Sequence, residues 1–110
     1  MKLYLDTSTN QTILKLDDQT YKWDSGHDLA ENLHAFIKTK LDENNKTWHD
    51  IEQITFMSGP GSFTSLRIGA AVVNTLADQL QIPLYDHKGA QHQIILPDYG
   101  RPANITQPKK

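Results

Sequence analysis

Two short segments of this chain carry residue types that can bind phosphate or a metal ion. The first is Asp6-Thr7-Ser8, a carboxylate followed by two hydroxyls at the end of an apolar run. The second follows about fifty residues later and reads Ser58-Gly59-Pro60-Gly61-Ser62-Phe63-Thr64-Ser65-Leu66-Arg67-Ile68-Gly69. Carboxylates hold metal ions, and hydroxyls together with the free N–H groups of a helix start hold phosphate oxygens. These two segments are the first place to look for function.

The second segment predicts a sharp corner between a strand and a helix. Gly59 and Gly61 can adopt positive φ or allow a close approach, and Pro60 disfavours helix at the residue before it. Ser62 and Thr64 are candidate N-caps of the following helix. A phosphate-binding loop and a turn that binds nothing both remain open, and the turn is favoured because the segment has no Walker-type lysine.

Other catalytic chemistry finds little support in the sequence. The five histidines do not show metal-ligand spacing, and no serine stands in a recognisable nucleophile pattern. The aromatic residues are not interleaved with basic ones, so they are expected in the core. Asp6 is predicted to cap its own turn rather than hold a metal ion. We therefore expect no catalytic residue, no metal and no cofactor.

Composition limits the size and the surroundings of the protein. A chain of 110 residues with 37% hydrophobic content can build one compact core, which excludes a two-lobed enzyme with a cleft between the lobes. The last 23 residues carry four bases against one acid on an otherwise acidic chain, so strong binding to nucleic acid, RNA included, is not expected of the chain alone. The absence of cysteine and of a long apolar run favours a cytoplasmic protein that does not bind membranes.

Hydrophobic periodicity predicts the order of elements. Residues 2–24 alternate like a three-stranded meander, residues 28–43 and 63–80 have helical periods, and residues 53–57 and 81–85 are typical of buried strands. The resulting order is βββαβαβ. Helix 63–80 is apolar over more than half of its circumference, so it must bury two faces. Either the first helix covers the second face or another molecule does.

The two segments together resemble those of the TsaB family, the non-catalytic subunit of the bacterial machinery that makes threonylcarbamoyladenosine on tRNA. The resemblance covers roughly residues 1–86 and departs at Ser65, where the family usually has glycine. It implies an α/β fold, a single RNase H-like lobe of the actin-like ATPase superfamily. The motif residues that carry it are Asp6, Thr7, Ser8, Gly59, Pro60, Gly61, Ser62, Phe63, Thr64, Arg67 and Gly69.

The resemblance also implies domain limits. Residues 1–86 would be the amino-terminal lobe, and residues 87–110 would be an irregular, partly disordered tail. Relatives carry a second lobe of about the same size, for which this chain has no room, and a weakly similar Pro-x-Tyr-x-Arg ending suggests that the middle was removed.

The partner that the resemblance implies is a TsaD-like catalytic subunit, which modifies the adenosine next to the anticodon. The two helices of this chain would pair with those of TsaD, and a TsaE-like ATPase would join the assembled complex. Two alternatives stay open: a nucleotide-binding or hydrolysing enzyme that uses Asp6 and the corner at Gly59, and a homodimeric interaction module. The expected interface residues are Leu33, Ile37, Leu66, Arg67, Ala70, Val73 and Asn74.

Overall fold

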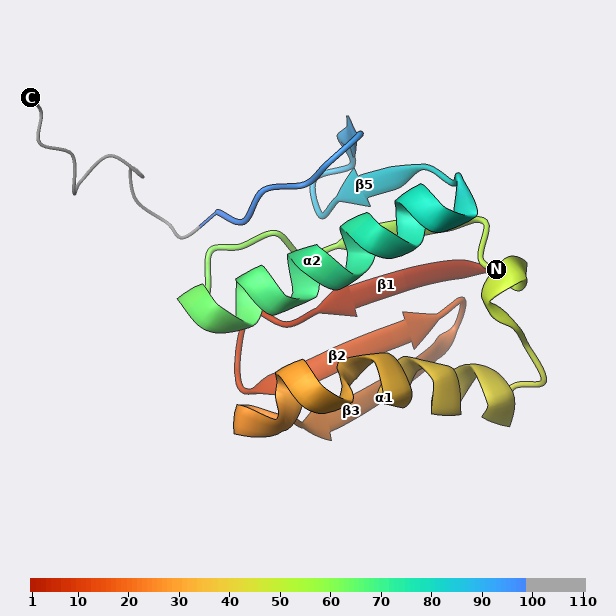
Figure 1. Cartoon of the computed structure of the whole chain (residues 1–110), viewed down its shortest axis with the longest axis horizontal. Helices are drawn as coiled ribbons and strands as arrows, with labels where there is room; N and C mark the ends of the chain where they lie inside the picture. The colour runs from red at the N-terminus through yellow and green to blue at the C-terminus, as the bar shows by residue number, and fades with distance from the viewer. Residues whose placement is uncertain (99–110) are drawn as a thin grey trace, which may run out of the picture.

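The computed structural model describes residues 1–98, which form one sheet with two long helices on one of its faces (Figure 1). Two single-turn 3-10 helices, η1 and η2, precede α1 and β4. The elements in chain order are β1 Lys2–Asp6, β2 Gln11–Leu16, β3 Gln19–Asp24, η1 Gly26–Asp28, α1 Leu29–Glu43, η2 Trp48–Asp50, β4 Gln53–Phe56, α2 Phe63–Leu80, β5 Leu84–Asp86 and β6 Gln91–His92.

The sheet has six strands in the order β3-β2-β1-β4-β5-β6. The first three strands form the antiparallel meander that the alternation predicted. β4 and β5 then add in parallel to β1, and α1 and α2 make the crossovers that parallel neighbours require. The arrangement confirms the predicted α/β lobe, and β6 extends it by one short antiparallel strand.

Local sequence explains where the elements end. The turn between β2 and β3 places Asp17 at φ +53°, and its carboxylate and amide bond the backbone of Lys2. α1 ends where Asn45 takes φ +57°, and α2 ends where Gln81 takes φ +57°. Asparagine is among the residues that tolerate this left-handed conformation best, which suits a helix end.

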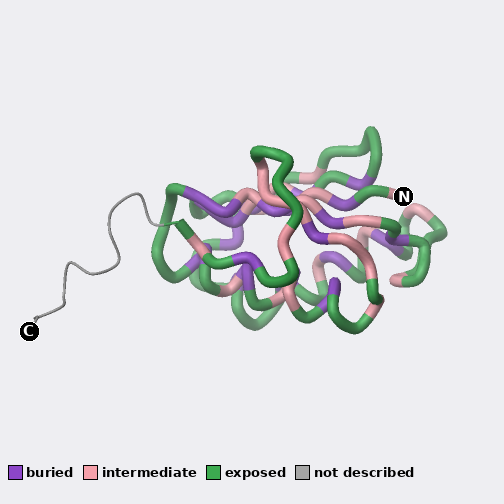
Figure 2. The backbone as a smooth tube through the Cα atoms, turned by 90° about the horizontal axis from the view of Figure 1, so that it is seen from above, coloured by how far each residue is buried: buried purple, intermediate pink, exposed green. Residues whose placement is uncertain are grey.

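The core lies between the helices and the inner face of the sheet. The four positions of α1 that recur every fourth residue are fully or almost fully buried: Leu29, Leu33, Ile37 and Leu41. Alternate residues of the central strands meet them, so that buried positions follow the strands and the inner turns of the helices (Figure 2). The other face of the sheet is more polar: Lys15 lies over the Tyr4 ring at 5.1 Å.

Residues 81–98 differ from the expectation. The fifth strand begins at Leu84 rather than residue 81, because Gln81 closes α2 and the Ile82 amide bonds the Ala77 carbonyl at 3.1 Å. Residues beyond 86, expected as a tail, contribute β6 and the buried side chain of Ile95. Such contacts are long-range, and the local pattern does not reveal them. The part of the predicted tail beyond residue 98, with most of its Pro-x-Tyr-x-Arg ending, lies outside the described residues.

Candidate functional site

The carboxylate of Asp6 is used inside its own turn. Its Oδ1 accepts hydrogen bonds from the Ser8 backbone N–H at 2.8 Å and from the Ser8 hydroxyl at 2.6 Å. This is the local cap that the sequence predicted, and it fixes the path of the chain as it leaves β1.

Thr7 ties the end of β1 to α2. Its side chain is fully buried, and its hydroxyl donates to the Ser65 carbonyl at 2.8 Å. Gly69 lies one turn after Ser65 on α2 and faces Thr7 as well. A β-carbon at Gly69 would overlap the Thr7 hydroxyl and would come within 2.7 Å of the Phe56 ring. Gly69 is therefore needed for close packing of α2 on the sheet.

The corner after β4 packs directly against the first segment. The Met57 amide donates to the Leu5 carbonyl at 2.9 Å, and the peptide bond between Gly59 and Pro60 is cis. Gly61 lies against Ser8, whose carbonyl accepts the Ser62 amide at 2.8 Å. The structure thus brings the two predicted segments into contact.

The hydroxyls at the start of α2 do not cap it. Ser62 occupies the N-cap position, but its side chain makes no capping hydrogen bond. Ser62, Phe63 and Thr64 are exposed, and the Arg67 guanidinium lies 5.6 Å from the centre of the Phe63 ring. The predicted helix start is confirmed, while the predicted cap is absent.

The carboxyl-terminal segment reaches the corner, which the sequence reasoning missed. The His87 Nδ1 lies 3.3 Å from the Ser58 hydroxyl and 3.4 Å from the Ser58 amide nitrogen. The Asp98 amide donates to the Ser58 carbonyl at 2.7 Å, and a β-carbon at Gly59 would overlap the Asp98 carbonyl. Gly59 has φ +127°, a conformation that favours glycine. No periodic signal in the sequence pairs these residues.

A second polar cluster organises the turn between β5 and β6. Asp86 Oδ2 lies 2.8 Å from His92 Nε2, and Asp86 Oδ1 accepts the amides of Lys88 and Ala90. These hydrogen bonds, above all the one from His92, lower the pKa of Asp86 to about 2. The cluster explains the turn as a structural feature. Within residues 1–98, no group of three acidic or histidine side chains is placed to hold a metal ion.

Most of the residues expected at a partner interface are buried in this chain's own core. Leu33, Ile37, Leu66 and Val73 have no exposed surface, and Ala70 is 4% exposed. That expectation was wrong for these five, because their side chains are already buried by other parts of this chain. Asn74 bonds the backbone of Ile95, whereas Arg67 is exposed on α2.

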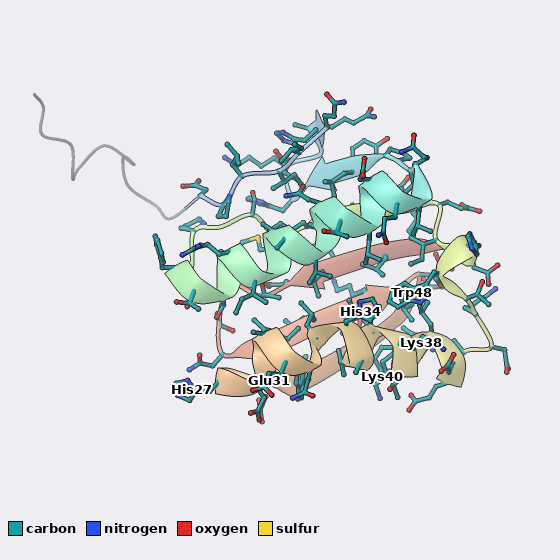
Figure 3. All side chains as sticks on the ribbon, viewed as in Figure 1. His27, Glu31, His34, Lys38, Lys40 and Trp48 are labelled. Atoms are coloured by element: carbon teal, nitrogen blue, oxygen red, sulfur yellow. The ribbon has the colours of Figure 1, made fainter. Side chains whose placement is uncertain are left out.

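The accessible face of the two helices is formed by other residues. A groove of about 230 Å³ lies between α1 and α2 and is lined by His34, Ala71, Val72, Thr75, Leu76 and Gln79. In Figure 3, His34 lies near Trp48, and the two ring centres are 4.8 Å apart. Glu31, His34 and Lys38 follow one stripe of α1 because three and four positions bring residues to the same side of a helix.

Comparison with known proteins shows that the chain is similar to proteins that make one modified nucleoside of tRNA. The family model described as "TsaD: tRNA N6-adenosine threonylcarbamoyltransferase" matches residues 24–88. The tRNA threonylcarbamoyladenosine biosynthesis protein TsaB of Buchnera aphidicola is 31% identical over 72 residues, which are 58% of this chain and 33% of that protein. The tRNA N6-adenosine threonylcarbamoyltransferase of Pyrobaculum islandicum is 34% identical over 64 residues, 57% of this chain and 19% of that enzyme.

Among solved structures, YeaZ from Pseudomonas aeruginosa superposes with a TM-score of 0.68 at 31% identity. The match covers 77% of this chain and 42% of YeaZ, which has an RNase H-like fold. The chain thus spans a third to two fifths of the length of these bacterial relatives.

Proposed function

The chain belongs to the TsaB family, within the wider family of the TsaD threonylcarbamoyltransferases, and from this we propose that it acts in threonylcarbamoyladenosine biosynthesis on tRNA as a non-catalytic subunit. It binds a TsaD-like protein and holds that protein in its active arrangement. The reaction takes place on the partner, and the present chain contributes no reacting group.

The observation that carries the non-catalytic role is the way the motif residues are used. The Asp6 carboxylate bonds Ser8, the Thr7 hydroxyl bonds the Ser65 carbonyl, and Gly61 lies against Ser8. Each of these groups serves either the turn after β1 or the contact of that turn with α2 and the corner before it. A catalytic group must face a substrate from a concave site. The Asp6 carboxylate and the Thr7 hydroxyl are instead occupied by hydrogen bonds within the chain.

The face proposed for the partner is the groove between α1 and α2. Ala71, Val72 and Thr75 are small enough to let a partner helix come close, and the His34 ring lines the other side of the groove. A helix laid along such a groove is a common mode of recognition. The exposed Glu31 and Lys38 on α1 would stand at the polar rim of the interface.

Two neighbouring valines of α2 test this assignment. Val72 is half-buried at the groove, whereas Val73 is fully buried in the core. Val72→Glu is expected to keep the melting temperature within a few degrees and to weaken binding of the TsaD-like protein by a hundredfold or more, because the carboxylate would be buried without a partner. Val73→Glu is expected to unfold the chain for the same reason.

The experiment is co-purification with the TsaD-like protein of the same organism, followed by a tRNA modification assay with and without this chain. Thr39→Glu, at an exposed position of α1 outside this groove, adds the same charge and serves as the control. Normal binding by Val72→Glu would reject the groove as the interface. ATP hydrolysis by the isolated chain that is lost in Asp6→Ala would reject the non-catalytic role.

A further inference from the structure

Residues 94–98, which we call the strap, run beside α2 and are tied down at two places. The Asn74 amide on α2 donates from Nδ2 to the Ile95 carbonyl at 3.0 Å and accepts the Ile95 N–H on Oδ1 at 2.8 Å. At its far end the Asp98 amide donates to the Ser58 carbonyl at 2.7 Å. One side chain of α2 therefore satisfies both backbone groups of one strap residue, as a neighbouring strand would.

Ile95 is the one residue of the strap that is buried. Ile95 is 1% exposed, whereas Ile94 and Leu96 on either side of it are 63% and 78% exposed. This alternation is typical of extended chain, in which neighbouring side chains point to opposite sides. Ala70 and Ala77 lie four and three positions from Asn74, on the same side of α2, and both are buried small residues.

We propose that the side of α2 around Asn74 is a docking groove for an extended peptide with one aliphatic side chain, and that the strap is its occupant in cis. The groove recognises main-chain N–H and C=O groups through Asn74 and one side chain through the pocket of Ile95. Such a division between backbone and side-chain recognition is that of peptide-binding grooves. The groove differs from the face at Val72, since two positions along a helix are about 200° apart.

Release of the strap would uncover the corner between β4 and α2. The strap covers Gly59 and bonds Ser58, so its departure exposes the corner together with the Ile95 pocket. A tethered strap competes at an effective concentration in the millimolar range. The groove is therefore closed in the chain as it stands and opens only when the strap is weakened or outcompeted.

The test uses the whole chain and a fluorescent peptide of sequence QIILPD, which copies residues 93–98. Ile95→Asp removes the side chain that holds the strap, so this variant is expected to bind the peptide at least tenfold more tightly than the unaltered chain. Ile94→Asp changes the exposed neighbour and is expected to bind no more peptide than the unaltered chain. A peptide with aspartate at its second isoleucine, and the double variant Ile95→Asp/Asn74→Leu, are expected not to bind.

Amide hydrogen exchange supplies a second measurement. In Asn74→Leu, exchange of the Ile95 and Asp98 amides is expected to rise at least tenfold while the amides of β1 keep their protection. Equal loss of protection in the strap and in β1 would mean that the strap is an inseparable part of the core, and would overturn the proposal. So would a folded Ile95→Asp variant that does not bind the peptide, or binding that survives Asn74→Leu.

Discussion

Replacement of Gly69 by alanine is expected to destabilise the chain, although alanine is the better helix former. In an exposed helix the change would gain about 1 kcal/mol. Here the new methyl group would overlap the Thr7 hydroxyl and press on the Phe56 ring. Overpacking of this kind costs about 1–3 kcal/mol, and loss of the buried bond from Thr7 to the Ser65 carbonyl costs about 1–3 kcal/mol more.

The expected net loss is about 3 kcal/mol, which corresponds to a fall in melting temperature of roughly 12–24 °C for a domain of this size. Thermal unfolding followed by circular dichroism measures it. Ala71→Gly, at an exposed position two residues further along α2, isolates the propensity term and should cost about 1 kcal/mol. Thr7→Ala removes the atom that is struck first, so the double variant Gly69→Ala/Thr7→Ala should lose less than the sum of the two single changes.

A melting temperature that is unchanged or raised in Gly69→Ala would refute the close packing of α2 on the end of β1. Additive losses in the double variant would refute the more specific claim that the Thr7 hydroxyl is the obstacle. In that case the methyl group would act through Phe56 alone.

Two further outcomes follow from hydrogen bonds of the aspartates at the carboxyl ends of β1 and β5. Asp6→Ala should lower the free energy of unfolding, measured with denaturant, by about 1–2 kcal/mol, because two hydrogen bonds from Ser8 lose their acceptor. Asp6→Asn should lower it less, since asparagine keeps one acceptor oxygen. Equal losses in the two variants would contradict the role of Asp6 in the turn. The pKa of Asp86 is about 2 in the fold against about 3.9 in an unfolded chain, so its contribution is present above about pH 4 and is lost as the pH falls toward 2. The difference in melting temperature between the unaltered chain and Asp86→Asn should therefore shrink from pH 7 to pH 2, and a constant difference would exclude this linkage.

The partner interface predicted from the sequence shows that hydrophobic periodicity cannot decide what a helix face contacts. The sequence predicted that helix 63–80 buries two faces and offered the first helix or another molecule as the cover of the second face, but neither explanation included the strap. Leu66 and Val73 face the sheet, and the strap at Asn74 and Ile95 covers another side. A period of 3.6 residues says which positions share a face but not what that face meets. Because of this, the predicted interface fell on core residues.

Local interactions are determined by the sequence alone. The meander, both helices, the turn at Asp6 and the glycine corner each depend on residues within a few positions of one another, so propensity and spacing were enough to predict them. No helix within residues 1–98 is long and apolar enough to cross a membrane.

Only the tertiary structure decided what joins segments that are distant in the chain. Thr7 meets Ser65, His87 and Asp98 meet Ser58, and Asn74 binds Ile95 through hydrogen bonds that span at least 21 positions. Each bond depends on how the sheet and the helices pack, and no local propensity favours it. The physical reason is that a side chain finds a distant partner only after burial of the core has fixed both backbones.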